Sequence, residues 1–133
     1  TDEPDITANS VTGLDVGDTV VPGVPALNSN LTITIDGGTP LPGATVTVNL
    51  TGAAMDPEDG ALPGASLGWT VTSVPAAPAA SLGSATGLVN TLDVIVPATG
   101  GGSQVHTLTL TSTDSCNATA ARIITITVTN NSP

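Results

Sequence analysis

The sequence has almost no positive charge. Its 133 residues contain one arginine, Arg122, and no lysine, against 11 acidic residues, and the formal net charge is −10. Nucleic acids and anionic membranes both attract proteins through clustered Lys and Arg side chains. The composition therefore excludes these two classes of partner. The absence of lysine also excludes isopeptide cross-links made through lysine side chains.

Cysteine, histidine and aromatic residues are equally scarce, with one Cys, one His, one Trp and no Phe or Tyr. A single cysteine cannot form a disulfide within the chain, and one His with one Cys falls short of the usual zinc ligand set. Trp69 alone cannot supply the stacking surface of a usual sugar site, and its phase with Leu67 and Val71 predicts a place in the core. No apolar run reaches the roughly 18 residues that a membrane-spanning helix needs.

The sequence predicts no enzyme. His106 shares a strand face with Leu108 and Leu110, so we expect a partly buried structural histidine at the mouth of that strand. Cys116 follows in a loop, and a Cys–His dyad would have to close across most of the strand, so an inert or intermolecular thiol is the better interpretation. The run Gly100-Gly101-Gly102 leads into another strand and so lacks the helix N-terminus of a phosphate site.

The dominant pattern is alternation of Val, Ile or Leu with Thr, which is typical of a sheet that is packed on one face and wet on the other. Gly and Pro turn signals separate the alternating runs, whereas residues 74–87 are rich in Pro, Ala and Ser and predict an edge segment or crossover. We therefore predict an all-β chain that forms an antiparallel sandwich. The predicted strands are residues 31–36, 44–51, 67–71, 88–96, 105–111 and 122–129.

Residues 44–130 resemble a PKD-like or bacterial Ig-like domain of secreted and cell-surface proteins. The resemblance lies in Val46-Thr47-Val48-Asn49-Leu50, the acidic turn Asp56-Pro57-Glu58-Asp59-Gly60 and the strand Leu67-Gly68-Trp69-Thr70-Val71. Residues 106–115 and 124–130 are similar to the last two strands of that family. The Gly-Asp-Gly run that follows the Trp in typical PKD domains is absent here. The resemblance implies an Ig-like sandwich that serves as a spacer, adhesion or assembly module.

The N-terminal part is less regular than the rest. We predict an extension over residues 1–39, comprising a strand-exchange arm at about residues 1–28 and a first strand, then the sandwich at 40–130 and a tail at 131–133. The irregular first thirty residues fit either an extra strand pair or an arm that pairs with a sheet edge of a neighbouring copy.

Acidic residues gather in two loops that an Ig-like order of strands brings to the same end of the sandwich. Several carboxylates with few competing cations are what Ca²⁺ binds, so the sequence predicts a calcium site. The alternative is a polar turn in which Pro fixes φ and Gly accepts a positive φ. The predicted ligands are Asp56, Glu58, Asp59 and Asp114.

Four Asn-x-Ser/Thr triplets predict glycan attachment if the host glycosylates the chain, at Asn30, Asn49, Asn117 and Asn130. They fit an exported, extracellular or cell-surface chain, as does a start at Thr1 without Met. The low share of charged residues, 9%, suits burial between copies. We therefore predict a self-assembling filament, pilus-like or sheath subunit whose partners are copies of itself. The alternatives are a spacer or adhesion module of a larger surface protein, joined through a linker at residues 129–133, and a calcium-dependent ligand binder.

Overall fold

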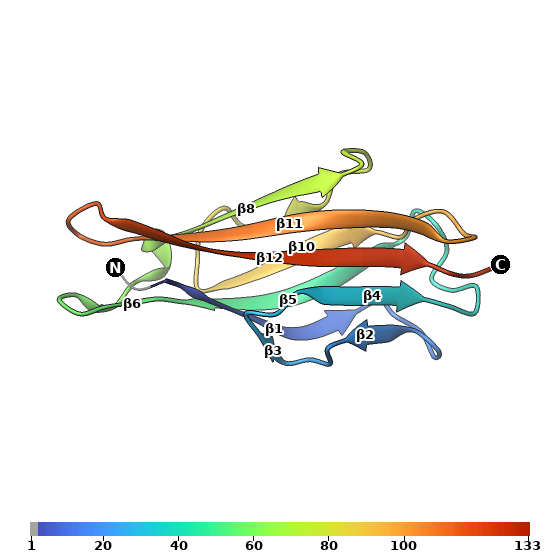
Figure 1. Cartoon of the computed structure of the whole chain (residues 1–133), viewed down its shortest axis with the longest axis horizontal. Coiled ribbons are helices and arrows are strands. Elements are labelled where there is room, and N and C mark those ends of the chain that lie inside the picture. The colour runs from blue at the N-terminus through green and yellow to red at the C-terminus, as the bar shows by residue number, and fades with distance from the viewer. Residues whose placement is uncertain (1–2) are drawn as a thin grey trace.

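The computed structural model describes residues 3–133 and consists of two five-stranded β-sheets packed as a sandwich (Figure 1). A short hairpin of β6 (Met55–Asp56) and β7 (Gly60–Ala61), with a 3-10 turn at Gly64–Ser66, lies outside both sheets. The described residues include no helix long and apolar enough to cross a membrane. Sheet A has the order β3 (Ala26–Leu27), β1 (Asp5–Thr12), β5 (Thr45–Ala53), β10 (Val89–Ile95), β9 (Ser81–Leu82). Sheet B has the order β2 (Thr19–Val21), β4 (Leu31–Ile35), β12 (Thr119–Asn130), β11 (Gly102–Thr113), β8 (Leu67–Val74).

Every strand predicted from the alternation is present. β4, β5, β8, β10, β11 and β12 correspond to the six predicted ranges, with β4, β5 and β10 beginning or ending one residue inside theirs, and their side chains alternate between more and less buried as the pattern requires. β11 and β12 are longer than predicted. They pair along their whole length, from Gly102 opposite Asn130 to Thr113 opposite Thr119. The added residues are mostly small or polar, so the alternation of apolar residues does not mark them. The all-β prediction and the sandwich arrangement are confirmed.

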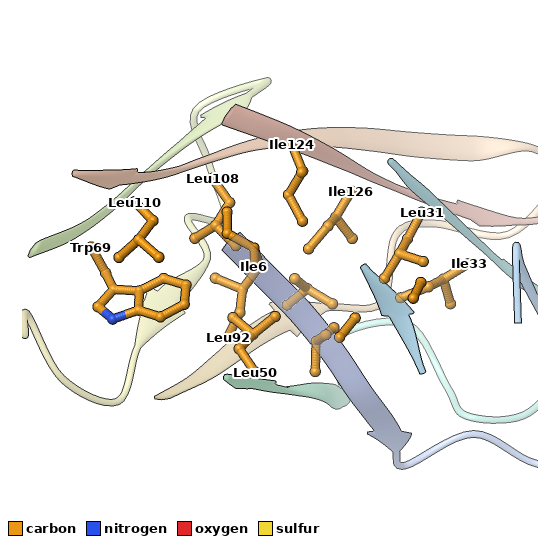
Figure 2. Close-up of a cluster of buried hydrophobic side chains, with 14 of the residues drawn as sticks. Ile6, Leu31, Ile33, Leu50, Trp69, Leu92, Leu108, Leu110, Ile124 and Ile126 are labelled. Carbon is orange, nitrogen blue, oxygen red and sulfur yellow. The ribbon is translucent and has the colours of Figure 1, made fainter. Parts of the chain in front are cut away.

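The core lies between the sheets and is filled by alternate side chains from both (Figure 2). Trp69 of β8 is 3% exposed, and its indole nitrogen donates to the carbonyl of Gly87 at 2.8 Å. Its ring covers Gly52 of β5, where a Cβ atom would stand 2.7 Å from the ring and 2.9 Å from Leu110. Gly52 is therefore the position that lets the only aromatic ring reach across the sandwich, and the prediction that Trp69 fills the core is confirmed.

The described part of the predicted extension belongs to the same two sheets. β1 pairs with β5 over most of its length and with β3 over two residues, while β2 pairs with β4. Ile6 and Ala8 of β1 are 0% and 1% exposed and lie in the same core cluster as the residues that follow position 40. The reason is hydrophobic: the inward side chains of β1 cover apolar surface that β5 would otherwise present to water.

One ladder departs from the predicted antiparallel arrangement. β4 runs parallel to β12, from Leu31 beside Ile126 to Ile35 beside Asn130. A parallel pair is allowed here because the two strands are far apart in the sequence and need no direct hairpin. The chain end is fixed nearby: Ser132 is buried, its hydroxyl accepts from the amide of Gly38 at 3.0 Å, and its carbonyl accepts from Gly100 at 2.8 Å.

Short segments cover the edges of both sheets. On one side, residues 19–28 supply β2 to sheet B and β3 to sheet A. On the other side, residues 81–87 supply β9 beside β10, and the amide of Trp69 in β8 donates to the carbonyl of Ala85 at 2.8 Å. The segment predicted as an edge or crossover, residues 74–87, is therefore confirmed in that role. Capped edges of this kind limit pairing with other chains.

Candidate functional site

The acidic residues singled out in the sequence lie at one end of the sandwich, in the loop that holds β6 and β7 and in the loop after β11. The Asp59 carboxylate accepts from the backbone amide of Ser115 at 3.0 Å and from the Ser115 hydroxyl at 2.9 and 3.0 Å. Asp56, Glu58 and Asp114 line one hollow of about 260 Å³ together with Pro57 and Cys116. The two loops therefore meet, as the assumed strand order requires.

Two of these carboxylates also shape their own turns. Asp56 is 6% exposed, and its Oδ1 accepts from the amides of Glu58 and Asp59 at 2.9 and 3.0 Å. Asp114 Oδ1 accepts from the amides of Cys116 and Ala118, both at 2.9 Å. Asp side chains that accept from amides a few residues ahead are a common way to stabilise a turn. Both acidic loops are therefore held by their own carboxylates.

A calcium ion at this end stays a prediction. Within residues 3–133, no group of three or more His, Cys, Asp or Glu side chains is placed to hold a metal ion. Glu58 and Asp59 are exposed, so a cation could approach them from solvent. The contacts described for Asp56 and Asp114 match the alternative interpretation, in which the acidic residues form polar turns.

A second polar cluster was not recognised in the sequence. His106 of β11 is completely buried rather than partly buried at the strand mouth, and its Nδ1 lies 2.8 Å from the hydroxyl of Ser73 in β8. The Ser73 hydroxyl also accepts from the amide of Ala80 at 3.2 Å. Within residues 3–133, His106 Nε2 has no hydrogen-bond partner, and burial lowers the pKa of the imidazole from 6.5. Burial therefore favours the neutral form of the ring.

Gln104, two residues before His106 on the same face, completes this cluster. It is 3% exposed, and its side-chain nitrogen donates to the carbonyls of Pro75 and Pro78 at 2.8 and 2.6 Å. The cluster therefore fastens the proline-rich crossover, residues 75–80, to β11. The signal was present in the alternation, which places Gln104 and His106 in phase with the buried Leu108.

Cys116 and Trp69, the other residues considered for chemistry, lie apart from His106. Cys116 is a free, exposed thiol in the loop after β11 and lines the acidic hollow. His106 is instead buried beside Ser73 within the strand. Trp69 exposes 3% of its surface, which leaves no face for a sugar ring.

The four predicted glycan acceptors differ in access. Asn30 and Asn117 are exposed, whereas Asn130 is 0% exposed and its amide nitrogen donates to the carbonyl of Pro97 at 3.0 Å. Asn49 is half-buried within β5, and its amide nitrogen donates to the hydroxyl of Ser10 at 2.9 Å. In the folded chain, only Asn30 and Asn117 present an amide nitrogen to solvent on an exposed residue.

Arg122 of β12 makes a further set of contacts, with residues at the start of the described chain, that the sequence pattern did not indicate. Arg122 Nη1 lies 3.1 Å from Glu3 Oε1, its Nη2 lies 4.0 Å from Asp5 Oδ1, and its Nε donates to the carbonyl of Pro4 at 3.2 Å. The only basic side chain of the sequence therefore holds the start of β1 against β12.

No family model, curated protein or solved structure matches the chain. The resemblance to PKD-like and bacterial Ig-like domains therefore stays a prediction from its motifs, and the fold is an all-β sandwich.

Proposed function

We propose that this protein is an extracellular structural subunit that assembles with copies of itself by exchanging the N-terminal strand β1. The observation that carries the proposal is the way in which β1 is held. The strand contributes Ile6 and Ala8 to the core, yet it pairs over its length only with β5, since β3 opposes it at two positions. An identical slot in another copy offers the same contacts, which is the basis of strand and domain exchange.

The connection after β1 suits an exchange. Residues 13–18 form a surface loop in which Gly13 and Gly17 adopt positive φ and Val16 is fully exposed. Extending this loop releases Leu14, which packs partly buried against the core, and the hydrogen bond from the Asp36 amide to Asp18, in addition to the contacts that β1 itself makes. The Arg122 contacts at Glu3, Pro4 and Asp5 would form again with the incoming strand.

Exchange is favoured over simple addition at an edge. Residues 19–28 and 81–87 already cover parts of the edges of both sheets, so a strand added at those parts would first have to displace one of them. Replacement of β1 by the β1 of a neighbour keeps both covers in place. When the rotation between successive copies does not close a ring, this head-to-tail contact repeats from copy to copy and forms a filament.

The extracellular setting rests on composition and surface chemistry. Charged residues make up 9% of the chain, and Asn30 and Asn117 are exposed acceptors for glycans. Both features suit a chain whose surface is covered by sugar or by other copies, and the resemblance to PKD-like domains points to the same setting.

Disulfide trapping tests the exchange. Thr7 and Thr51 oppose each other on β1 and β5, and Thr113 and Thr119 oppose each other on β11 and β12. Each pair is changed to cysteine in a Cys116→Ser background, and the assembled protein is oxidised and run on a denaturing gel. Exchange predicts that the first pair links different chains into a ladder, while the second pair links within one chain.

The exchange is overturned if the Thr7→Cys and Thr51→Cys pair links only within a chain at every protein concentration. The hairpin pair is the matched control, because its two strands are adjacent in the sequence and stay together in either form.

A second candidate, a spacer module of a larger surface protein, is favoured by the position of the chain ends (Figure 1). Arg122 at the start of β12 contacts Pro4, and β12 then continues to Asn130, which places the two ends roughly 25 Å apart along the strand. Modules with ends on opposite sides form extended strings. A two-copy tandem chain should therefore have about twice the length of one copy by small-angle scattering, and a compact pair would contradict the spacer role.

A further inference from the structure

The outer face of sheet B is a regular array of threonines. Along β11 and β12 the outward positions are mostly Thr, and the ladders bring them side by side. One row runs from Thr72 through Thr107 to Thr125, and another runs from Thr129 through Thr34 to Thr19. Neighbouring rows are about 6.6 Å apart and neighbouring strands about 4.8 Å apart. We call this surface the threonine face.

A row of three valines and two threonines crosses the threonine face from one edge to the other. Val74, Val105, Thr127, Thr32 and Val21 are successive partners on all five strands of sheet B. The valines at the two edges, Val74 and Val21, are 71% and 62% exposed. The outward Ile123, on the same face, is 60% exposed.

The threonine face carries no charge at any outward position of the described strands of sheet B. This is unusual in a chain with a net charge of −10, whose outer face on sheet A includes Asp5 and Asp93. Two copies of the chain repel one another wherever acidic surfaces meet, and like charges in contact cost several kcal/mol. The threonine face is the broad surface on which two copies can meet without that repulsion.

The chemistry of the threonine face also matches itself. A threonine hydroxyl both donates and accepts a hydrogen bond, so identical faces can satisfy each other's hydroxyls while their methyl groups pack. With five strands and up to 12 residues in a strand, the face covers on the order of 600 to 800 Å². A standard interface buries about 800 Å² on each partner.

We propose that the threonine face binds the threonine face of a second copy, in a two-fold symmetric contact between sheets about 10 Å apart. The contact goes beyond the proposed exchange of β1, because β1 lies in sheet A and the threonine face belongs to sheet B. It supplies a lateral pairing between subunits or filaments. Since its core is uncharged while the rest of each copy is anionic, added salt strengthens the contact by screening the long-range repulsion.

The test is the mass of the full chain in solution, measured by sedimentation in a Cys116→Ser background to prevent disulfide dimers. Thr107→Asp places a carboxylate near the centre of the threonine face, and Ile123→Asp does so at a side chain that is 60% exposed and makes no core contact. Thr45→Asp adds the same charge to the outer face of sheet A and is the matched control. Circular dichroism checks that each variant is folded.

The expected result is a two-chain species that grows with salt, binds at least about tenfold more weakly in both threonine-face variants, and is unchanged in Thr45→Asp. The contact must also persist when the Thr7→Cys and Thr51→Cys disulfide closes β1 within its own chain, which separates it from strand exchange. A one-chain mass at the highest soluble concentration, or equal weakening in all three aspartate variants, overturns the proposal. So does a face that takes up another molecule while the chain itself stays a monomer.

Discussion

The outer faces of sheet A and sheet B are built from the same alternation, but their polar side chains have different partners. On sheet A they bond to one another: the Thr47 hydroxyl donates to Asp93 at 2.7 Å, and Asn9 donates to Thr51. On the described outer face of sheet B, the only hydrogen bond between side chains joins Ser103 and Thr129, at 3.1 Å. One face is satisfied within the chain, whereas the other leaves its hydroxyls to water or to a partner.

This difference teaches that the two faces should respond differently to the same substitution. A polar side chain on the outer face of sheet A is hydrogen-bonded to its neighbours, so its removal lowers the free energy of unfolding of the isolated chain. A side chain on the threonine face has few such hydrogen bonds, so its removal should weaken the association of copies rather than the stability of the chain.

The largest expected effect is a loss in the free energy of unfolding, and it distinguishes an inward residue of sheet A from an outward residue of sheet B. Ile6 is 0% exposed and Ile123 is 60% exposed. Ile6→Ala should lower the free energy of unfolding by about 2 to 5 kcal/mol, because it leaves a cavity in the core. Ile123→Ala should stay within about 0.5 kcal/mol of the parent chain. Urea unfolding measures both, and equal losses would mean that β1 is not part of the stable core.

The next effect concerns pH and the buried face of sheet B. His106 is completely buried, and burial lowers its pKa from 6.5. Below pH 6.5 the imidazole of the unfolded chain therefore binds a proton more readily than that of the folded chain. The His106 contribution to the free energy of unfolding is complete above that pH and decreases as the pH drops below it. For one proton the slope has an upper limit of about 1.4 kcal/mol per pH unit.

Replacing His106 with leucine should flatten this slope, which denaturant titrations between about pH 5 and 7 would reveal. Sheet A serves as the comparison, since its buried polar residue, Asn90, does not titrate. A slope that survives in His106→Leu would assign the pH dependence to another group.

A smaller effect compares one threonine on each outer face. Thr47→Val removes the hydrogen bond to Asp93 on sheet A and should cost about 1 kcal/mol. Thr109→Val on the threonine face removes no side-chain hydrogen bond of the described chain and should be neutral or slightly stabilising. Melting temperatures of the two variants test the contrast, which fails if Thr109→Val is the more damaging change.

The smallest effect concerns the acidic end, away from both faces. If Ca²⁺ binds there with the roughly millimolar affinity of extracellular modules, then about 1 mM Ca²⁺ should add about 0.4 kcal/mol of stability. Glu58→Gln should remove this gain, while Asp36→Asn, in an exposed residue after β4, should leave it intact. An unchanged melting temperature on adding Ca²⁺ and then a chelator would leave the acidic residues with their turn-forming role alone.

The alternation of apolar residues was enough to predict the strands that form most of both sheets and the burial of Trp69. These features depend on the period of the pattern, which a local stretch of sequence contains in full. The meeting of the acidic loops needed a further assumption, an Ig-like order of strands, because that order fixes which loops share an end.

Other features depend on pairing between distant segments, and the sequence did not reveal them. The place of β1 inside the sandwich requires the bulged ladder to β5, and the parallel pairing of β4 with β12 requires a crossing between the sheets. The cluster of His106, Ser73 and Gln104 forms only when the crossover folds back on β11. None of these contacts has a local signature, since each joins residues at least 26 positions apart.

The position of Arg122 has a consequence for the resistance of the chain to proteolysis. Proteases that cut after basic residues find a single target bond in the sequence, between Arg122 and Ile123. That bond lies in the half of β12 that pairs with β11 alone, since β4 joins β12 only from Ile126 onward, and the arginine itself is engaged with Glu3 and Pro4. Cleavage there requires this part of β12 to separate from β11 first, so a trypsin-like enzyme would act at a rate set by that local opening.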